Sequence, residues 1–164
     1  IWYSTRHSVT WITGKIISVL IKAGLKNDPR IRKALDFLRK TQNEEGGWPS
    51  HAENPQRTDL WAMEEVIEAF IDAGEPKDSS LIGRAVKAIL KYRERWKEPV
   101  ENPLGIFLKL GYPPDHPYVI ECLNHLIAGR HEDGGWGYYN HLPSSLSQTL
   151  HWIKHLTKLG LIKR

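Results

Sequence analysis

The 164-residue sequence contains one cysteine and one methionine, and it has no long apolar run. With Cys122 alone, neither an internal disulfide nor a cysteine-rich zinc site can form. The most apolar stretch, "ITGKIISVLIKAGL", is interrupted by Lys15 and Lys22, whereas a bilayer span needs roughly 18 apolar residues. Arg6 interrupts the N-terminal stretch where a signal peptide would need its apolar region. These absences predict a cytoplasmic protein without a transmembrane segment.

Acidic residues are scarce at the N-terminal end of the chain. The net charge is +4, and residues 1–50 carry nine Lys/Arg against four Asp/Glu. Two interpretations fit this excess: a solvated helix surface, or a surface for an anionic partner. No base-reading motif accompanies the basic residues, so nucleic-acid binding is not predicted.

A helical periodicity of apolar residues runs through the whole chain. In residues 8–24, for example, Val9, Ile12, Ile16 and Val19 recur at intervals of three and four. Asp and Pro at 28 and 29 suit the first positions of a further helix. The same criteria predict helices over residues 8–24, 29–42, 58–74, 79–96, 103–111, 117–130 and 145–160. The fold class predicted is therefore all-α.

Four of these segments close on a glycine, and the glycines are regularly spaced. They are Gly24, Gly74, Gly111 and Gly160, with a mean spacing of about 45 residues. This period is typical of one helical hairpin per repeat. The spacing therefore predicts an array of about three and a half hairpin repeats.

One polar turn occurs twice in the sequence. "KTQNEEGGWPS" spans residues 40–50, and "GRHEDGGWGYY" spans residues 129–139, so the two Gly-Gly-Trp triplets stand 88 residues apart. Glycine adopts backbone angles that other residues resist, so the chain can reverse here and lay an indole on the preceding helix end. The Gln42 amide can bond backbone groups near the helix terminus. We expect Gln42 and Trp48 to support the fold.

The residues around these turns resemble a known repeat. "ALDFLRKTQNEEGGW" looks like the QW repeat of the terpenoid cyclase and protein prenyltransferase superfamily, which includes squalene-hopene-type cyclases. "CLNHLIAGRHEDGGW" is the second copy, with Arg130 in place of the Gln. In that superfamily the repeat is a structural element of the α/α toroid, so it indicates fold more than activity.

The resemblance implies two concentric rings of helices. Residues 8–24, 58–74, 103–111 and 145–160 would be inner helices, and residues 29–42, 79–96 and 117–130 would be outer ones. A complete toroid has about six hairpins, whereas this chain has about half that number. We therefore expect one domain over residues 1–164 that forms a half-toroid. Because the chain starts at Ile1, one interpretation is that it is a piece of a longer protein; a protein partner or a homodimer could also complete the ring.

The catalytic motifs of the resembled enzymes are missing from this sequence. Neither the Asp-x-Asp-Asp of squalene-hopene-type cyclases nor the Asp-Asp-x-x-Asp of metal-dependent terpene synthases occurs. Of the acid pairs, Glu44-Glu45 and Glu132-Asp133 lie in the glycine turns and are expected to be solvated. Glu64-Glu65 stands on an inner helix, where either an exposed helix face or an acid with a raised pKa fits. No catalytic residue is assigned.

Metal sites are not predicted either. Prenyltransferases hold zinc with an Asp and a Cys two residues apart, a spacing that Cys122 lacks, and Cys122 is expected to be buried as a small apolar residue. His151 and His155 have the spacing of two ligands on one helix, yet no Glu follows His151 and no third ligand is evident nearby; His125 and His131 are the only plausible third partners. We expect these two histidines to lie on the surface, and we expect no cofactor.

Aromatic residues on the inner helices are the main candidates for a binding site. Trp11 and Trp61 both stand 13 residues before a closing glycine, and Trp152 stands eight before another. The resemblance implies that such residues line a cavity that holds isoprenoids; ordinary core packing explains them equally well. The polar residues expected near the same rim are His7, Thr10, Asp59 and Glu65.

Two functions remain open at this point. The first is a non-catalytic relative that binds an isoprenoid, another hydrophobic ligand or a protein partner on a concave, aromatic-lined surface. The second is part of a terpene cyclase or prenyltransferase whose catalytic acids or metal site lie outside this chain. The missing motifs favour the first function, and the resemblance keeps the second function open.

Overall fold

The computed structural model describes residues 9–162, and these residues form an all-helical protein, as the periodicity predicted. The α-helices are α1 (Thr10–Lys22), α2 (Pro29–Thr41), α3 (Leu60–Ala73), α4 (Ser80–Lys91), α5 (Leu104–Leu110), α6 (Pro117–Ala128) and α7 (Leu146–Lys158). Two short 3₁₀ helices, η1 (Arg93–Arg95) and η2 (Pro99–Glu101), follow α4. Among the described residues, β pairing is limited to a single bridge between Val9 and His51.

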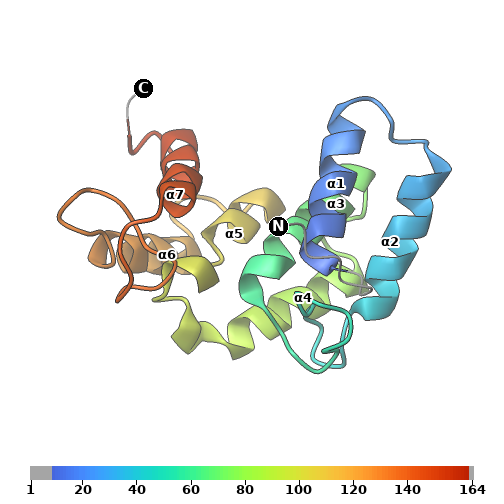
Figure 1. Cartoon of the computed structure of the whole chain (residues 1–164), viewed down its shortest axis with the longest axis horizontal. Coiled ribbons are helices and arrows are strands. Elements are labelled where there is room, and N and C mark those ends of the chain that lie inside the picture. Colours follow the sequence, from blue (N-terminus) through green and yellow to red (C-terminus); the bar gives the residue numbers. More distant parts are fainter. Residues whose placement is uncertain (1–8, 163–164) are drawn as a thin grey trace. The chain divides into compact units, whose positions relative to one another are not determined.

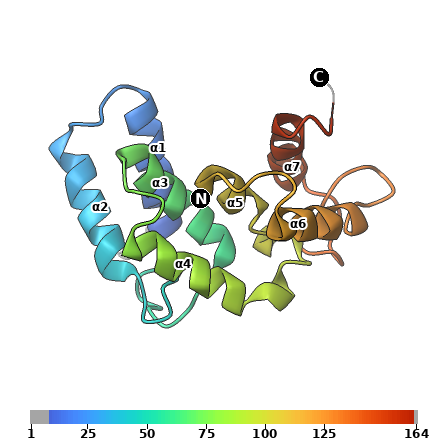
Figure 2. The same ribbon diagram turned by 180° about the vertical axis from the view of Figure 1, so that it is seen from behind.

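The chain divides into two compact units, Ile1–Lys91 (unit 1) and Tyr92–Arg164 (unit 2). Unit 1 contains α1 to α4, and Figure 1 shows α1 with α2 and α3 beside it. Unit 2 contains α5 to α7, which Figure 2 shows from behind. Each unit holds one copy of the duplicated turn. The toroid arrangement and the single domain over residues 1–164 stay predictions.

Local sequence signals set the helix boundaries. The Asp28 carboxylate accepts a hydrogen bond from the Arg30 backbone N–H at 2.8 Å, with Pro29 in the first turn, which confirms the predicted N-cap. The closing glycines have the φ values that a side chain resists, +86° at Gly24 and +100° at Gly74, for example. These glycines therefore end their helices as expected.

The prediction for α4 was wrong at its C-terminal end. The helix stops at Lys91, and η1 follows where a continuous helix to Trp96 was expected. Trp96 is fully buried with its ring centroid 5.4 Å from that of Phe107, and its carbonyl accepts a hydrogen bond from the Asn102 amide at 2.9 Å. These contacts with the following segment bury Trp96 after the chain has left the helix.

The first glycine turn ties α2 to α4. Trp48 is fully buried, and its indole N–H donates to the Leu38 carbonyl in α2 at 2.7 Å. The Gln42 amide donates to the carbonyls of Gly46 at 2.9 Å and of Leu81 in α4 at 3.0 Å. Gly46 has a φ of +92°. The turn thus has the structural role expected of Gln42 and Trp48.

The second glycine turn repeats this geometry inside unit 2. Trp136 donates its indole N–H to the Leu126 carbonyl at 2.8 Å, again ten residues back. Arg130 takes the place of the Gln, and its Nε donates to the Gly134 carbonyl at 2.9 Å. The Arg130 guanidinium also lies over the Trp136 ring, 5.6 Å from its centroid. Arginine therefore preserves the hydrogen bond that the Gln makes in the first turn.

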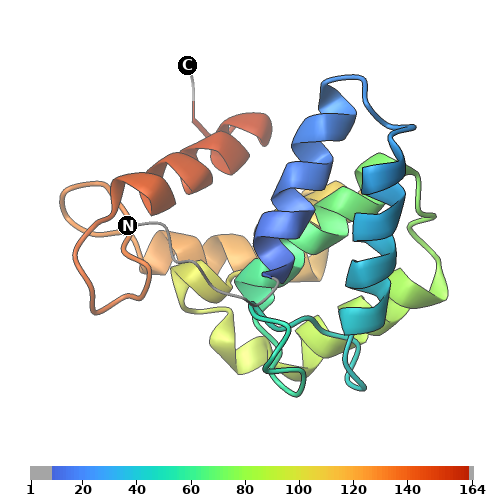
Figure 3. The ribbon, with the colours of Figure 1, turned by 45° about the vertical axis from the view of Figure 1, so that its right-hand side comes forward.

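In unit 1 the most extensive helix packing joins α1 to α3 (Figure 3). A Cβ on Gly14 would lie 2.6 Å from the Glu65 carbonyl oxygen and 3.0 Å from the Val66 nitrogen, so only glycine allows this approach. α1 buries Thr10, Gly14, Ile17 and Ser18. The apolar residues that indicated this helix in the sequence, Ile12, Ile16 and Val19, are exposed.

Candidate functional site

Trp11 and Trp61, the first candidate residues, form an aromatic pair across the seam between α1 and α3. Their ring centroids lie 4.9 Å apart at an interplanar angle of 54°. Both side chains are half-buried, whereas four other tryptophans, Trp48, Trp96, Trp136 and Trp152, are buried. The pair therefore offers a partly accessible aromatic surface at one end of the seam.

Three ion pairs continue the same edge of the seam. The Lys15 ammonium lies 3.4 Å from a Glu65 carboxylate oxygen. The Lys22 ammonium lies 2.5 Å from Glu68 and 3.4 Å from Asp72. Because Trp11, Lys15 and Lys22 meet residues 61, 65 and 72, α1 and α3 run parallel with an offset of 50 residues. Two helices of equivalent repeats thus lie side by side in register.

Glu65 is the most chemically distinctive residue beside the tryptophan pair. It stands one helical turn after Trp61, and burial raises the pKa of its carboxyl. The neighbouring acids Glu64 and Glu68 raise this pKa further, while Lys15 opposes the shift. A carboxyl of this kind keeps its proton to higher pH than usual. It can donate a hydrogen bond to a ligand oxygen at the edge of an aromatic surface.

Asp59 and Thr10, predicted at the rim, are buried and bonded to the loop after the first turn. The Asp59 carboxylate accepts hydrogen bonds from the Ser50 backbone N–H at 2.8 Å and from Arg57 Nε at 2.6 Å. The Thr10 hydroxyl donates to the Pro49 carbonyl. Both residues therefore support the loop, and a ligand role for Asp59 stays a prediction. His7 lies outside the described residues.

Trp152, the remaining candidate, belongs to α7 in unit 2. Its side chain is 1% exposed, and its ring lies against His151 with centroids 4.5 Å apart. The indole N–H has no hydrogen-bond partner among the described residues. Core packing accounts for this ring, and ligand binding by Trp152 stays a prediction.

The two histidines of α7 differ from the expectation that they lie on the surface. Their ring centroids are 4.7 Å apart, and His155 is buried while His151 is half-buried. The prediction was wrong for His155 because its position faces the packed side of α7, next to buried Leu156. Periodicity did not reveal this, since apolar residues occur on several faces of α7.

Cys122 is fully buried, as predicted. Desolvation raises the pKa of its thiol well above the usual range, so the sulfur is a poor nucleophile and a poor zinc ligand. The Asn102 amide bonds the Cys122 carbonyl at 3.0 Å. Cys122 thus acts as a small core residue in α6.

Two acids of the glycine turns, Glu45 and Asp133, make contacts that support the turns. Glu44 is exposed as expected, whereas Glu45 is half-buried and its carboxylate lies 2.5 Å from the Lys91 ammonium. Asp133 is exposed and accepts a hydrogen bond from the Gly135 backbone N–H at 2.9 Å, which lowers the pKa of its carboxyl. These acids act within the fold.

Lys15 and Lys22 are the site residues that the sequence analysis missed. Both were noted only because they interrupt an apolar run. A signal was present, since opposite charges stand 50 residues apart at Lys15 and Glu65 and again at Lys22 and Asp72. The repeat offset, applied to charged residues as well as to glycines, would have paired them.

Comparison with known proteins shows a sequence similarity between this chain and a cyclase. Over 138 residues it is 29% identical to squalene–hopene cyclase of Bradyrhizobium diazoefficiens, and the alignment covers 82% of this chain and 16% of that protein. The chain thus spans a small part of the length of the curated relative it matches. No protein-family model and no solved structure matches the chain. The similarity supports a distant relationship to terpenoid cyclases.

Within residues 9–162, none of the helices combines the length and the apolar character that crossing a membrane requires.

Proposed function

We propose that this chain is a terpenoid-cyclase-like helical module that binds an isoprenoid or a similar apolar ligand against the Trp11–Trp61 pair, without catalysis of its own. The observation that carries the proposal is this half-buried pair, with centroids 4.9 Å apart, next to the half-buried carboxyl of Glu65.

Partial exposure separates this pair from the other described tryptophans. Trp48 and Trp136 donate indole hydrogen bonds that hold the glycine turns, and Trp96 fills the core of unit 2. Core packing explains those three rings fully. Trp11 and Trp61 keep accessible surface that an apolar ligand can cover, and two adjacent indole faces give a large contact area at low entropic cost.

Glu65 is the proposed hydrogen-bond partner for the polar end of the ligand. A carboxyl with a raised pKa donates a hydrogen bond when protonated, and it accepts one from a hydroxyl when ionised. An isoprenoid alcohol combines a long apolar body with one hydroxyl. Trp61 and Glu65 stand one turn apart on α3, so body and hydroxyl can be bound by the same helix.

The fold proposed for this module is the α/α toroid type of the cyclases. The parallel, in-register packing of α1 and α3 supports it, because neighbouring inner helices of a ring of hairpins run in the same direction. Further hairpins, from another chain or from more sequence, would complete such a ring.

The similar protein is itself an enzyme, a cyclase, and this observation favours a second function. The alignment covers 16% of that cyclase. In that case the chain would be part of a terpene cyclase, and the acid that starts the reaction would come from outside it. The sequence contains neither acid motif of such enzymes, so the binding module remains the first proposal.

Titration of the chain with farnesol, followed by tryptophan fluorescence, tests the proposal. Saturable quenching is expected, and Trp61→Ala should weaken binding by about tenfold or more, since an aromatic contact surface is removed. The exposed Tyr138, changed to Ala, is the matched control and should bind as the parent does.

Loss of folding would imitate loss of binding, so circular dichroism melting accompanies each titration. Trp61→Phe keeps an aromatic ring and is expected to melt normally while binding more weakly. Unchanged affinity in both Trp61 variants would refute the proposed site. Turnover of squalene by the chain alone would favour the enzyme.

A further inference from the structure

His131, in the second glycine turn, is a titratable residue that the proposed ligand site does not use. It is half-buried, and both of its ring nitrogens have a partner. Nδ1 lies 3.1 Å from the Ser144 hydroxyl oxygen, and Nε2 lies 3.2 Å from the Asn140 carbonyl oxygen. The Ser144 hydroxyl in turn donates to the Asp133 carboxylate at 2.7 Å. His131 therefore joins the turn to two points of the segment that leads into α7.

These partners determine the protonation of His131. The Asn140 carbonyl can only accept, so Nε2 must donate to it. The Asp133 carboxylate also accepts, because hydrogen bonds from the Gly135 N–H and from Ser144 lower the pKa of its carboxyl. Ser144 has one hydroxyl proton and gives it to Asp133, so Nδ1 must donate to the Ser144 oxygen. Both ring nitrogens thus carry a proton, which only the charged imidazolium form allows.

The first glycine turn contains the same network with an amide in place of the imidazole. Asn43 stands 88 residues before His131. Its amide nitrogen donates to the Thr58 hydroxyl at 3.0 Å and to the Arg57 carbonyl at 3.1 Å. The Thr58 hydroxyl donates to the Glu45 carboxylate at 3.4 Å. An amide nitrogen carries two protons at every pH, whereas an imidazole carries two only when it is charged.

The backbone shows that Asn43 and His131 are equivalent positions. The Asn43 N–H donates to the Gly47 carbonyl at 2.9 Å, and the His131 N–H donates to the Gly135 carbonyl at 3.0 Å. Each residue thus closes its turn by the same bond and then donates from its side chain to a hydroxyl and to a backbone carbonyl. The second turn has replaced a donor that is independent of pH by one that titrates.

Two carboxylates belong to the network of His131. Asp133 shares the Ser144 hydroxyl with the imidazole, and the charge of His131 is among the causes that lower the pKa of the Asp133 carboxyl. Glu98, on the segment before η2, accepts a hydrogen bond from the Asn140 backbone N–H at 2.9 Å. Both negative charges attract a positively charged ring.

The basic groups nearby are engaged elsewhere or exposed. The Arg130 guanidinium lies over the Trp136 ring, 5.6 Å from its centroid. Lys97 and His141 are exposed. Residues 146–150, which form the first turn of α7, carry no charge. The charges that act most directly on the imidazole are therefore those of the carboxylates.

We infer that His131 is a pH-dependent clamp, which in its imidazolium form fastens residues 137–144 to the second glycine turn at both Asn140 and Ser144. Histidine ordinarily changes its charge between about pH 5 and about pH 8. A neutral ring has one proton too few, so either the Asn140 contact or the link through Ser144 to Asp133 loses its donor. We call residues 137–144 the clamped loop.

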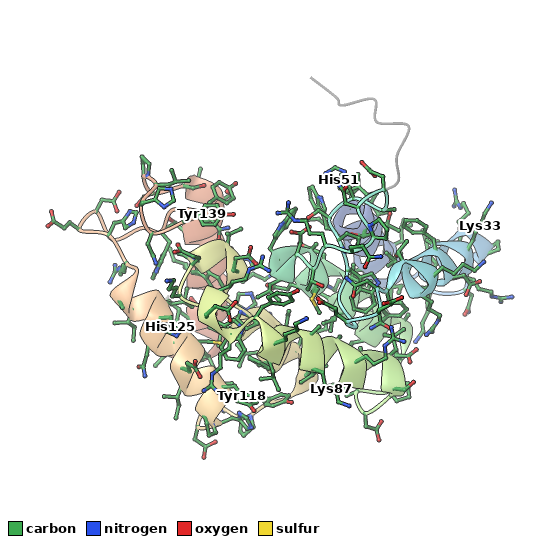
Figure 4. The ribbon with its side chains drawn as sticks, turned by 90° about the horizontal axis from the view of Figure 1, so that it is seen from below. Lys33, His51, Lys87, Tyr118, His125 and Tyr139 are labelled. Carbon is green, nitrogen blue, oxygen red and sulfur yellow. The ribbon has the colours of Figure 1, made fainter. Side chains whose placement is uncertain are left out.

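The clamped loop exposes the large side chains of Tyr138, Tyr139 and Leu142. Figure 4 shows Tyr139 on this loop. Asn140 also connects the loop to the segment before η2, since its side-chain amide donates to the Lys97 carbonyl at 2.8 Å. Loss of a proton from the imidazole therefore loosens an exposed aromatic part of unit 2 as pH rises.

Amide hydrogen exchange in the full chain, followed by NMR, tests the clamp. The Ser145 N–H is the reporter, because it closes the clamped loop by donating to the Trp136 carbonyl at 2.8 Å. Its exchange rate is divided by the intrinsic rate at each pH, which gives a protection factor. This factor should fall about tenfold from about pH 5 to about pH 8, since a hydrogen bond to a charged group is lost.

Two variants locate the origin of the effect. His131→Asn gives the second turn the residue of the first, whose amide donates two protons at every pH, so the tenfold fall should disappear. His141→Asn removes an exposed histidine from the same loop and is the matched control, which should keep the fall. Thermal melting of each variant checks that it folds.

The parent chain allows a measurement that does not depend on any variant. In a ¹H–¹⁵N NMR spectrum at about pH 5, His131 should show two ring N–H signals, because hydrogen bonds to Ser144 and Asn140 slow the exchange of both protons with water. One of the two signals should be lost as pH rises.

Four outcomes would overturn the inference. They are a single His131 ring N–H signal at every pH, a constant Ser145 protection factor in the parent, an equal fall in His131→Asn, and a fall that His141→Asn abolishes. Because His131 belongs to unit 2 and the Trp11–Trp61 pair to unit 1, failure here leaves the proposed ligand site intact.

Discussion

Gly46 and Gly83 both belong to unit 1, but they differ in backbone conformation and in the space around them. Gly46 has a φ of +92°, and a Cβ there would overlap the Arg84 carbonyl, whereas Gly83 is exposed in α4 with open space around it. We predict that Gly46→Ala lowers the free energy of unfolding by more than about 1 kcal/mol. Gly83→Ala should raise it by up to about 1 kcal/mol. Urea unfolding of both variants measures the contrast, and equal effects would contradict the role given to the first turn.

Glu65 leads to a prediction about pH. Its folded pKa lies above the ordinary value of 4.5, chiefly because of burial. As pH rises above about 4.5, the unfolded chain loses this proton first, so the free energy of unfolding falls until the folded carboxyl has also ionised. Once the folded carboxyl has ionised, the contribution of Glu65 to the free energy of unfolding no longer changes with pH.

The measurement is urea unfolding of the parent chain and Glu65→Gln between acid and neutral pH. The parent should lose stability relative to the variant across this window. Glu121→Gln is the control with the opposite sign: the bond from Arg93 lowers the Glu121 pKa, so that carboxylate contributes stability that is lost as pH falls. A flat difference for Glu65 would mean that its carboxyl is not desolvated.

Single residues were predictable where the chain repeats itself. The contacts of Gln42 and Trp48 followed from two copies of one turn, and Arg130 keeps the Gln bond in the second copy. The bonds of Asp59 and Thr10 were not predictable, because their partners lie in a loop that only tertiary packing places beside them.

Helix α1 shows that tertiary packing also limited the prediction for a whole element. Its boundaries were predicted within about two residues, the usual accuracy for helix ends. Its packed face was not, because the close approach to α3 depends on Gly14 and Ser18, which carry almost no apolar side chain. Apolar periodicity cannot identify a seam built from small residues.

That packing gives a prediction at the scale of the helix. Ile17 is 1% exposed, so Ile17→Ala should lower the free energy of unfolding by about 2–5 kcal/mol. Val19→Ala, two residues on, removes an exposed side chain and should change it by less than about 0.5 kcal/mol. Equal losses at both positions would show that Ile12, Ile16 and Val19 are covered in solution.

On the scale of the whole molecule, the all-helical class and the repeat were evident from glycine spacing and the duplicated turn. The division into two units could not be predicted, because the sequence of a helical repeat array has the same periodicity whether it packs as one unit or as two. The 29% identity with a squalene–hopene cyclase, over 82% of this chain, agrees with the resemblance of the turns. A toroid arrangement stays a prediction.

The central claim is that an apolar ligand binds at the Trp11–Trp61 pair. The measurement that tests it most directly is a ¹H–¹⁵N NMR spectrum of the indole N–H signals of the seven tryptophans, recorded during titration with farnesol. We predict that the Trp11 and Trp61 signals shift together and saturably, while those of Trp48 and Trp136, whose N–H groups are bonded in the core, stay in place. Saturable shifts at the buried tryptophans, with Trp11 and Trp61 unchanged, would contradict the claim.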